Sequence, residues 1–258
     1  DFNVIYKKNI WENSDYLKKE INKFDVIIVR NKTNLNQSIL EKAENLKYIG
    51  RLGVGLDNID TEYCKKNNIF VQPATGMNAD SVAEYVISSS LSLLKKTKLI
   101  NAKTQNGQWP RTSIATNELK GKILGLIGFG DIAKKVLKLI NAFEVTTIAF
   151  DPFITSQEME EKNVKKVTFE NILSLADIIS IHVQLNNETK YLFDKKTFQK
   201  MNNKPIIINS SRGGIINEID LLEAYKNNYI SGFALDVYEH EPVNKIFLKN
   251  ITNDMNCI

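Results

Sequence analysis

The feature that most constrains the fold of this chain is an alternation of short apolar runs with segments of helical periodicity. In the first third, the apolar runs lie at 25–30, 46–50 and 69–72, and amphipathic stretches such as 36–46 separate them. Strands that alternate with helices build parallel sheets, because a parallel connection needs a crossover. We therefore predict an α/β fold for this part, with 25–30 as a buried strand and an end near Gly76.

A second alternating series begins at Lys122. Its expected strands are 123–127, 147–150, 178–182, 205–208 and 232–235, and its expected helices include 132–140 and 218–225. Between the two series, Ser81 and Glu84 have the spacing of a capping box, and apolar residues follow at helical spacing. We expect a long helix to start at Ser81 and residues 101–120 to form an irregular loop.

The composition limits the class of protein. Of the 258 residues, 43% are hydrophobic and 25% are charged, which is ordinary for a soluble globular chain. No apolar run reaches about 18 residues, and no cationic and apolar leader follows Asp1, so neither a membrane span nor a signal peptide is expected. The net charge of +4 is scattered along the chain, which disfavours a nucleic-acid-binding arm.

Cysteine and histidine are both scarce, with Cys64 and Cys257, and His182 and His240. Their number and spacing exclude a disulfide framework and a His-rich metal site, and they fit a reducing compartment. We therefore expect a cytoplasmic protein with no metal site, no nucleic-acid partner and no membrane association.

The strongest local motif is the run from Gly128 to Ala133, which follows an apolar strand and opens a helix. Here Gly128 permits a tight turn, Gly130 lets the backbone approach a diphosphate, and Ala133 allows close packing of helix on strand. Asp151 ends the next expected strand, where a carboxylate accepts hydrogen bonds from ribose hydroxyls and repels a 2′-phosphate. The motif predicts an NAD site rather than an NADP site; the alternative is a turn with an unrelated Asp.

A second glycine-rich run extends from Gly50 to Asp60. Its unobstructed backbone amides, together with Arg51, are suited to holding a small carboxylate. The alternative is a purely structural turn.

Two further motifs follow expected strands, at 209–214 and 236–242. Arg212, between small residues, is placed to bind a carboxylate or a polarised carbonyl oxygen with two hydrogen bonds; the alternative is a surface Arg in a salt bridge. Asp236 is placed to contact a nicotinamide, and Glu241 precedes Pro242 in a stiff turn. For this last motif, a solvated acidic loop is the simpler interpretation.

Together these motifs resemble the D-2-hydroxyacid dehydrogenase family, with phosphoglycerate dehydrogenase as the branch that looks nearest. The resemblance covers nearly the whole chain and is carried by Gly50–Asp60, Ser81–Glu84, Gly107–Trp109, Gly128–Ala133, Asp151–Phe153, Asp177–Leu185, Asn209–Gly214 and Asp236–Pro242. It implies two Rossmann- or flavodoxin-like parallel-sheet domains with an interdomain cleft. Residues 1–78 would be a substrate-binding domain and 79–249 an NAD-binding domain, with the chain from 250–258 onward returning to the first.

The resemblance also implies roles for individual residues. Those implied to bind NAD are Gly128, Gly130, Asp131, Ile132, Asp151, His182, Val183, Ser210, Ser211, Arg212 and Asp236. Those implied to bind the substrate are Arg51, Leu52, Gly53, Val54, Gly55 and Arg212. Of these, Arg212 would polarise the reacting oxygen, and Glu241 would raise the pKa of a catalytic histidine.

That histidine is the main departure from the family pattern. The family places it in a Pro-His motif shortly after the Glu-Pro turn, and the sequence stops at Ile258 before such a motif. Neither His182 nor His240 matches it, so we expect the natural chain to continue; a chain that ended here would bind NAD but catalyse poorly. A smaller departure is Gln184, where the family usually has Pro.

The implied reaction is the NAD-dependent interconversion of a small 2-hydroxy acid and its 2-oxo acid, with phosphoglycerate, and thus serine biosynthesis, as the first expectation. Glyoxylate, hydroxypyruvate and sulfolactate follow as substrates. Alternatives of other kinds are an NAD-binding corepressor-like scaffold without turnover and an alanine-dehydrogenase-like enzyme. The resemblance further implies a homodimer formed through the NAD-binding domain, around Ser81–Trp109.

Overall fold

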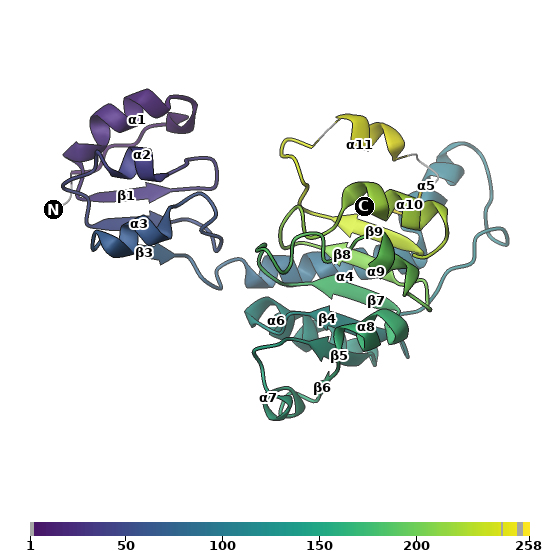
Figure 1. Ribbon diagram of the computed structural model, residues 1–258. Helices are drawn as coiled ribbons and strands as arrows, with labels where there is room; N and C mark the ends of the chain where they lie inside the picture. The colour runs from purple at the N-terminus through teal and green to yellow at the C-terminus, as the bar shows by residue number, and fades with distance from the viewer. Residues whose placement is uncertain (1–2, 244, 252–254) are drawn as a thin grey trace. The chain divides into compact units, whose positions relative to one another are not determined.

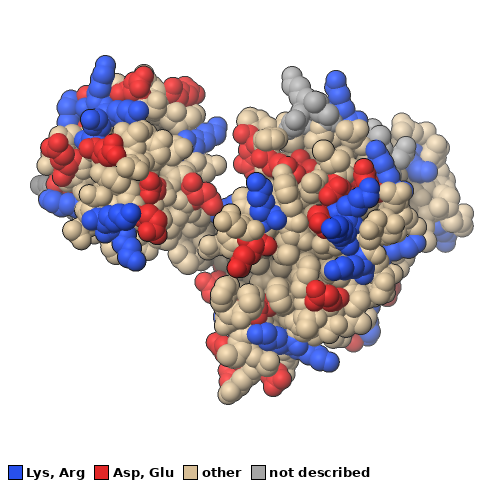
Figure 2. Space-filling view, viewed as in Figure 1, with Lys and Arg blue, Asp and Glu red and all other residues tan. Residues whose placement is uncertain are grey.

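The computed structural model describes residues 3–243, 245–251 and 255–258 (Figure 1). The chain divides into two compact units, Asp1–Asn78 and Ala79–Ile258. Lys and Arg side chains are interspersed with Asp and Glu over the visible face of each unit (Figure 2). This distribution agrees with the scattered charges of the sequence.

The first unit contains a three-stranded parallel sheet in the order β1-β2-β3. The strands are β1 (Val26–Val29), β2 (Tyr48–Arg51) and β3 (Phe70–Pro73), and the helices are α1 (Ser14–Glu20), α2 (Gln37–Leu40) and α3 (Thr61–Lys66), with 3-10 turns at Ile10–Glu12 and Ile21–Lys23. Each helix begins after a side-chain cap, because Asn13, Asn36 and Asp60 accept hydrogen bonds from backbone N–H groups three residues later.

The sheet of the first unit is covered on one face only. Val29 and Ile49 join side chains of α1, α2 and α3 in one buried cluster. The side chains of the other face are exposed: Val26 by 46%, Ile28 by 66%, Tyr48 by 52% and Phe70 by 55%. The prediction of a buried strand at 25–30 was therefore wrong for most of its residues, since Val29 is the one among them that is buried and no described segment packs on the other face.

The second unit contains a six-stranded sheet, parallel throughout, in the order β6-β5-β4-β7-β8-β9. The strands are β4 (Ile123–Ile127), β5 (Thr146–Phe150), β6 (Lys165–Lys166), β7 (Ile178–Ile181), β8 (Ile206–Asn209) and β9 (Gly232–Leu235). The described helices are α4 (Ala79–Lys95), α5 (Thr97–Gln105), α6 (Asp131–Ile140), α7 (Ser156–Glu160), α8 (Phe169–Leu175), α9 (Lys195–Gln199), α10 (Glu218–Lys226) and α11 (Lys245–Asn250), with a 3-10 turn at Asn141–Phe143.

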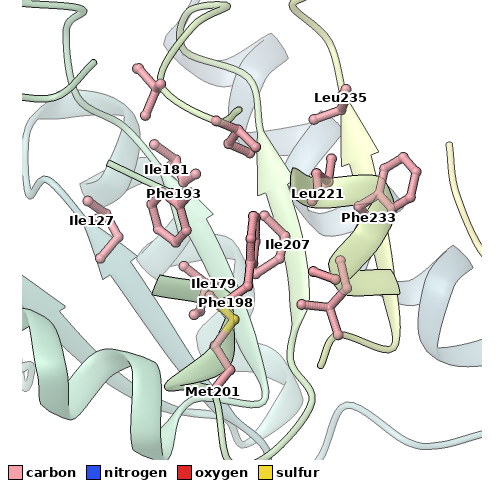
Figure 3. Packing of buried hydrophobic residues seen from close by; sticks show 14 of the residues in the cluster. Ile127, Ile179, Ile181, Phe193, Phe198, Met201, Ile207, Leu221, Phe233 and Leu235 are labelled. Carbon is pink, nitrogen blue, oxygen red and sulfur yellow. The ribbon is translucent and has the colours of Figure 1, made fainter. Parts of the chain in front are cut away.

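Both faces of this sheet are buried, since successive side chains of a strand point to opposite faces. Ile178 and Ile208 pack with side chains of α4 and α6 in one cluster. Ile179 and Ile207 pack with side chains of α8, α9 and α10 in a second cluster (Figure 3). The fold is thus the doubly covered parallel sheet that the sequence predicted for this part.

Two helix predictions need correction. Helix α4 begins at Ala79, so Ser81 lies inside its first turn instead of capping it. Helix α5 occupies Thr97–Gln105, part of which was expected to be loop. Between the two helices Lys96 has a φ of 51°, a left-handed conformation that ends one helix and starts the next in a new direction.

The last described residues belong to the second unit. Phe233 of β9 forms a parallel bridge with Cys257, and its carbonyl accepts a hydrogen bond of 3.0 Å from the Ile258 N–H. Met255 and Cys257 are buried in the same cluster as Phe233. The expectation that 250–258 return to the first unit was therefore wrong for these residues, because their apolar side chains are buried against β9; Asn253 and Asp254 lie outside the described residues.

None of the described helices has the length and apolar character of a membrane-spanning segment. Within the same described ranges, no group of three or more His, Cys, Asp or Glu side chains is arranged to hold a metal ion.

Candidate functional site

The carboxyl ends of β4, β5, β7, β8 and β9 lie at one edge of the second unit's sheet, because all of these strands are parallel. The residues that follow them are Gly128, Asp151, His182, Ser210 and Asp236. Strand order reverses between β4 and β7, and ligands of open α/β sheets bind outside such a reversal. The edge therefore brings the residues predicted to bind NAD together.

The glycine turn after β4 contains two glycines with different requirements. Gly128 has a φ of 89°, and a Cβ there would lie 2.6 Å from the backbone oxygen of His182. Gly130 has a φ of −81°, and a Cβ there would meet nothing within 4 Å. The fold itself thus requires glycine at 128, whereas at 130 a side chain would only fill open space.

That open space adjoins the beginning of α6, which starts at Asp131 without a side-chain cap. Uncapped N–H groups and the positive end of the helix dipole favour an anion at this point. A diphosphate that approaches the backbone here needs the space a side chain at 130 would occupy. The turn therefore has the open space and the uncapped helix start that the diphosphate of a dinucleotide requires.

Asp151 has a structural role that the sequence analysis missed. One carboxylate oxygen accepts a 2.9 Å hydrogen bond from the Phe129 N–H, and the other accepts from Phe153 and Ile154 at 2.8 and 3.3 Å. The side chain thus ties the end of β5 to the glycine turn. Each carboxylate oxygen has two lone pairs, so the same group retains capacity for ribose hydroxyls.

His182 is held as a neutral packing residue. Its Nε2 lies 2.9 Å from the Ser180 hydroxyl, and burial lowers its pKa to about 4. A ring with this pKa is neutral near pH 7, so the imidazolium form that serves as a general acid is not populated there. Its backbone packs against Gly128, and Val183 lies 3.0 Å from the position of a Cβ on that glycine, so both residues border the glycine turn.

The loop after β8 is built on Asn209, which is 2% exposed. Its Nδ2 donates to the Arg212 carbonyl at 2.9 Å, and its Oδ1 accepts from the backbone and hydroxyl of Ser211 at 3.1 and 2.7 Å. The sequence analysis treated Asn209 as part of a motif without a role of its own. A buried polar residue at the end of an apolar strand is the signal that identifies it.

Ser210 next to it has a buried hydroxyl with no hydrogen-bond partner among the described residues. Buried polar groups in proteins are nearly always paired, with protein, water or ligand. Together with the open space at Gly130, this hydroxyl indicates that the edge is shaped for a bound molecule.

The loop after β9 lies against the loop after β8. The Asp236 N–H donates to the Asn209 carbonyl at 3.0 Å, and the Tyr238 N–H donates to the Glu241 carboxylate at 3.3 Å. Burial raises the pKa of Asp236, and the negative charge of Glu241 raises it further. The loops of Arg212 and Glu241 are thus neighbours at this edge.

Apart from Arg212, the residues predicted to bind substrate lie in the first unit, at the last residue of β2 and on the loop after it. The Arg51 Nη1 donates to the carbonyl of exposed Leu52 at 3.0 Å, and a Cβ on Gly53, whose φ is 153°, would lie 1.5 Å from that nitrogen. The guanidinium therefore lies over its own loop, and Val54 and Gly55 follow as partly exposed residues. The expected cleft between the domains stays a prediction.

Comparisons with known proteins agree with this architecture. The sequence profile described as "D-isomer specific 2-hydroxyacid dehydrogenase, NAD binding domain" matches residues 87–255. The D-3-phosphoglycerate dehydrogenase of Bacillus subtilis is 38% identical over 242 residues, which are 94% of this chain and 45% of that protein. The (S)-sulfolactate dehydrogenase of Chromohalobacter salexigens is 36% identical over 218 residues, 84% of this chain and 71% of that protein.

The chain belongs to the D-isomer specific 2-hydroxyacid dehydrogenase family. A solved structure of D-lactate dehydrogenase from Aquifex aeolicus, complexed with NAD and lactic acid, matches with a TM-score of 0.81 at 30% identity, over 90% of this chain and 69% of that one. The family resemblance and the Rossmann-type fold are thus confirmed, and residues 87–255 are the NAD-binding domain of this family. The chain spans less than half the length of the Bacillus relative.

Proposed function

We propose that this chain binds NAD at the carboxyl edge of the second unit's sheet and interconverts a small 2-hydroxy acid and its 2-oxo acid. The observation that carries the proposal is the glycine turn after β4, where open space at Gly130 adjoins an uncapped helix start. Asp151 follows β5 and the orphan hydroxyl of Ser210 follows β8, so both lie at the same edge of the sheet. Phosphoglycerate is the first candidate substrate, because the Bacillus relative is named for it.

Each part of the edge has a separate task. The N–H groups of Asp131 and Ile132 hold the diphosphate, Asp151 accepts hydrogen bonds from the adenine ribose, and its charge disfavours a 2′-phosphate. The nicotinamide end would be bordered by Val183, Ser210, Ser211 and Asp236. The backbone of His182 would lie beside the glycine turn at this end. Bound NAD supplies the hydride acceptor, and NADH the hydride donor.

Arg212 and Glu241 act on the substrate side. A guanidinium binds a carboxylate or the oxygen at C2 with two hydrogen bonds, and its positive charge stabilises the negative charge that develops on that oxygen. Glu241 is placed to hold a histidine in its charged form. In the first unit, the loop Arg51–Gly55 is proposed to hold the substrate carboxylate.

The reaction also moves one proton to or from the hydroxyl at C2, which a group titrating near neutrality does best. His182 does not qualify, because its pKa is about 4 and its Nε2 faces Ser180. His240 lies exposed beside the acidic residues of its loop. The acid/base histidine expected in a Pro-His motif after residue 258 stays a prediction.

A second candidate substrate is sulfolactate, because the Chromohalobacter relative is named for it. This chain covers 71% of that relative's length. Phosphate and sulfonate groups are both tetrahedral anions that a cationic loop binds alike. Glyoxylate and hydroxypyruvate remain alternatives that lack this group. A corepressor-like scaffold would bind NAD and leave every one of these acids unchanged.

We also propose a homodimer, formed around Ser81–Trp109, and a place in the cytoplasm and in serine biosynthesis. Trp109 is 79% exposed, and large exposed aromatic side chains are enriched at protein interfaces. The two described cysteines are free and buried, which fits a reducing compartment. Sedimentation of the wild type and Trp109→Ser tests the dimer, since loss of a central aromatic anchor shifts the protein toward monomer.

The decisive experiment measures NADH binding and NADH oxidation with one preparation of the full natural protein, including the residues after 258 in which the acid/base histidine is predicted. NADH fluorescence gives the dissociation constant, and absorbance at the NADH band follows oxidation with 3-phosphohydroxypyruvate, 3-sulfopyruvate, hydroxypyruvate and glyoxylate. We expect saturable NADH binding and the highest kcat/KM with 3-phosphohydroxypyruvate. Binding without oxidation of any acid would favour the scaffold, and absence of binding would refute the proposal.

A further inference from the structure

The loop that carries Arg212 and the loop that carries Glu241 touch through their backbones. A Cβ on Gly213 would lie 1.8 Å from the Tyr238 oxygen and 2.8 Å from the Glu239 nitrogen. Gly213 has no positive φ, so its conformation suits any residue and the close approach alone requires glycine. The two loops therefore cannot keep their spacing if position 213 carries a side chain.

Two glutamates join the Glu241 loop, by reciprocal bonds, to the start of α10, the helix that follows the Arg212 loop. The Glu218 N–H donates to the Glu239 carboxylate at 2.8 Å, and the Glu239 N–H donates to the Glu218 carboxylate at 2.6 Å. Hydrogen bonds to an ionised acceptor are stronger than neutral ones. Glu218 is the first residue of α10, where the helix dipole favours both negative charges.

A third bond fixes the orientation of one carboxylate. The Tyr191 hydroxyl donates to the second Glu239 oxygen at 3.1 Å, and this bond raises the pKa of Tyr191. Burial, and the negative charge of Glu239, raise the pKa of Glu218, so placing two carboxylates here costs free energy. The reciprocal N–H bonds and the bond from Tyr191 offset that cost in one particular geometry.

We propose that Gly213, Glu218 and Glu239 form a latch that holds the Glu241 loop at a set distance from the Arg212 loop. The three are positioning residues, since none of them is placed against cofactor or substrate. The latch rests on the proposed function, in which Arg212 and Glu241 act together on one substrate. Its consequence is that hydride transfer depends on residues that contribute little to NAD affinity.

The first test measures hydrogen exchange and needs no activity. Because the two bonds are reciprocal, Glu239→Ala is expected to speed amide exchange in the peptide that contains Glu218 as well as in the 236–242 loop. The matched control is Glu223→Gln, which alters an exposed glutamate of the same helix that pairs with Lys195 at 3.0 Å. It is expected to leave both peptides at wild-type exchange rates.

The second test separates positioning from general stability by rescue and by kinetics. Glu239→Gln keeps one carbonyl oxygen to accept from the Glu218 N–H, so it is expected to restore most of the protection and turnover that Glu239→Ala loses. The alanine variant is expected to lower kcat about tenfold or more, because small displacements of reacting groups are costly. NADH affinity is expected to stay within about threefold of wild type, since the contacts after β4 and β5 are untouched.

The third test compares alanine substitutions at two adjacent glycines, Gly213 and Gly214. Gly213→Ala is expected to speed exchange in both loops, because the methyl group meets backbone atoms. Gly214→Ala adds the same methyl group where it meets only the Leu185 side chain, at 3.8 Å, although at a φ of 78°. It is expected to lower the melting temperature without uncoupling the two loops.

The latch is overturned if Glu239→Ala leaves exchange at Glu218 unchanged, or if an active wild type keeps its full kcat in both Glu239→Ala and Gly213→Ala. A wild type that shows neither NADH binding nor turnover refutes the proposed function instead. In that case the exchange measurements still decide whether the two loops are coupled.

Discussion

The two sheets of this protein are built from similar sequences and are buried differently. The β1 segment Val-Ile-Ile-Val is wholly apolar and the β7 segment Ile-Ile-Ser-Ile contains a serine, yet β1 has one covered face and β7 is buried on both. The difference lies in the neighbours, because helices pack on both faces of the second sheet, and described segments cover one face of the first. An apolar run thus predicts a strand but not how many of its faces are covered.

The two glycine loops extend this comparison to function. The Gly53 loop lies beneath the side chain of its own Arg51, whereas Gly130 faces open space at the start of a helix. Both loops were predicted to bind a ligand, the first from its glycines and Arg51 and the second from its glycines, the flanking strand and helix, and Asp151. The second unit therefore has open space beside its glycine turn, whereas in the first unit the Arg51 side chain fills the space beside Gly53.

The largest expected effect concerns the two glycines after β4. Gly128→Ala places a methyl group against the His182 backbone oxygen at a φ of 89°, and we expect it to destabilise the second unit by about 3 kcal/mol or more. Gly130→Ala meets nothing, so its stability is expected to stay within about 0.5 kcal/mol of wild type, while NADH affinity falls about tenfold or more. Urea denaturation and NADH titration measure both; equal effects of the two variants would remove the distinction between fold and site.

The next effect compares the two sheets directly. Ile179→Ala in β7 removes a fully buried side chain, and we expect a loss of about 3 kcal/mol in unfolding free energy. Ile28→Ala in β1 removes one that is 66% exposed, so its cost is expected to stay below about 1 kcal/mol. If Ile28→Ala proved as costly as Ile179→Ala, its face of the first sheet would be covered in solution.

A smaller effect is expected from the pH dependence of the second unit. The pKa of His182 is lowered to about 4 in the fold, from an ordinary value of 6.5, so the unfolded chain binds its proton first as the pH falls. Stability is therefore lost between about pH 6.5 and pH 4, and this residue contributes about 3 kcal/mol of that loss. His182→Gln is expected to flatten this part of the stability curve, measured by urea denaturation at several pH values.

Exposed His240 provides the matched control for that prediction. His240→Gln changes a histidine in the same way but at the surface, so its pH dependence is expected to follow wild type. If wild type and His182→Gln lost stability in parallel down to pH 4, the imidazole would be solvated and not held neutral.

Much of the strand order along the chain of the second unit could be predicted, because glycine or acidic residues mark where its apolar strands end. The bounds 123–127 and 232–235 are those of β4 and β9, and both strands are apolar on both faces and flanked by glycine or acidic residues. Parallel pairing then places Gly128, Asp151 and Asp236 at one edge without further information. This is why most of the candidate site could be located from sequence.

The remaining features depend on contacts between loops that are distant in sequence. The bonds from the Asp151 carboxylate to Phe129 and from Glu239 to Glu218 join segments that no local pattern connects. The position of Cys257 beside β9 likewise depends on its packing with Phe233 in one buried cluster, which the local sequence does not specify. Such contacts are decided by packing, so propensity and spacing did not reveal them.

The central claim is that the carboxyl edge of the second sheet binds NAD through the glycine turn and Asp151. Calorimetric titration of the wild type, Asp151→Asn and Asp151→Ala with NADH and NADPH tests it most directly. The account predicts that wild type binds NADH about tenfold or more tightly than NADPH, and that both variants lose this preference, Asp151→Ala also losing affinity because the glycine turn loses its tie. A wild type that binds neither dinucleotide, or variants with an unchanged preference for NADH, would contradict it.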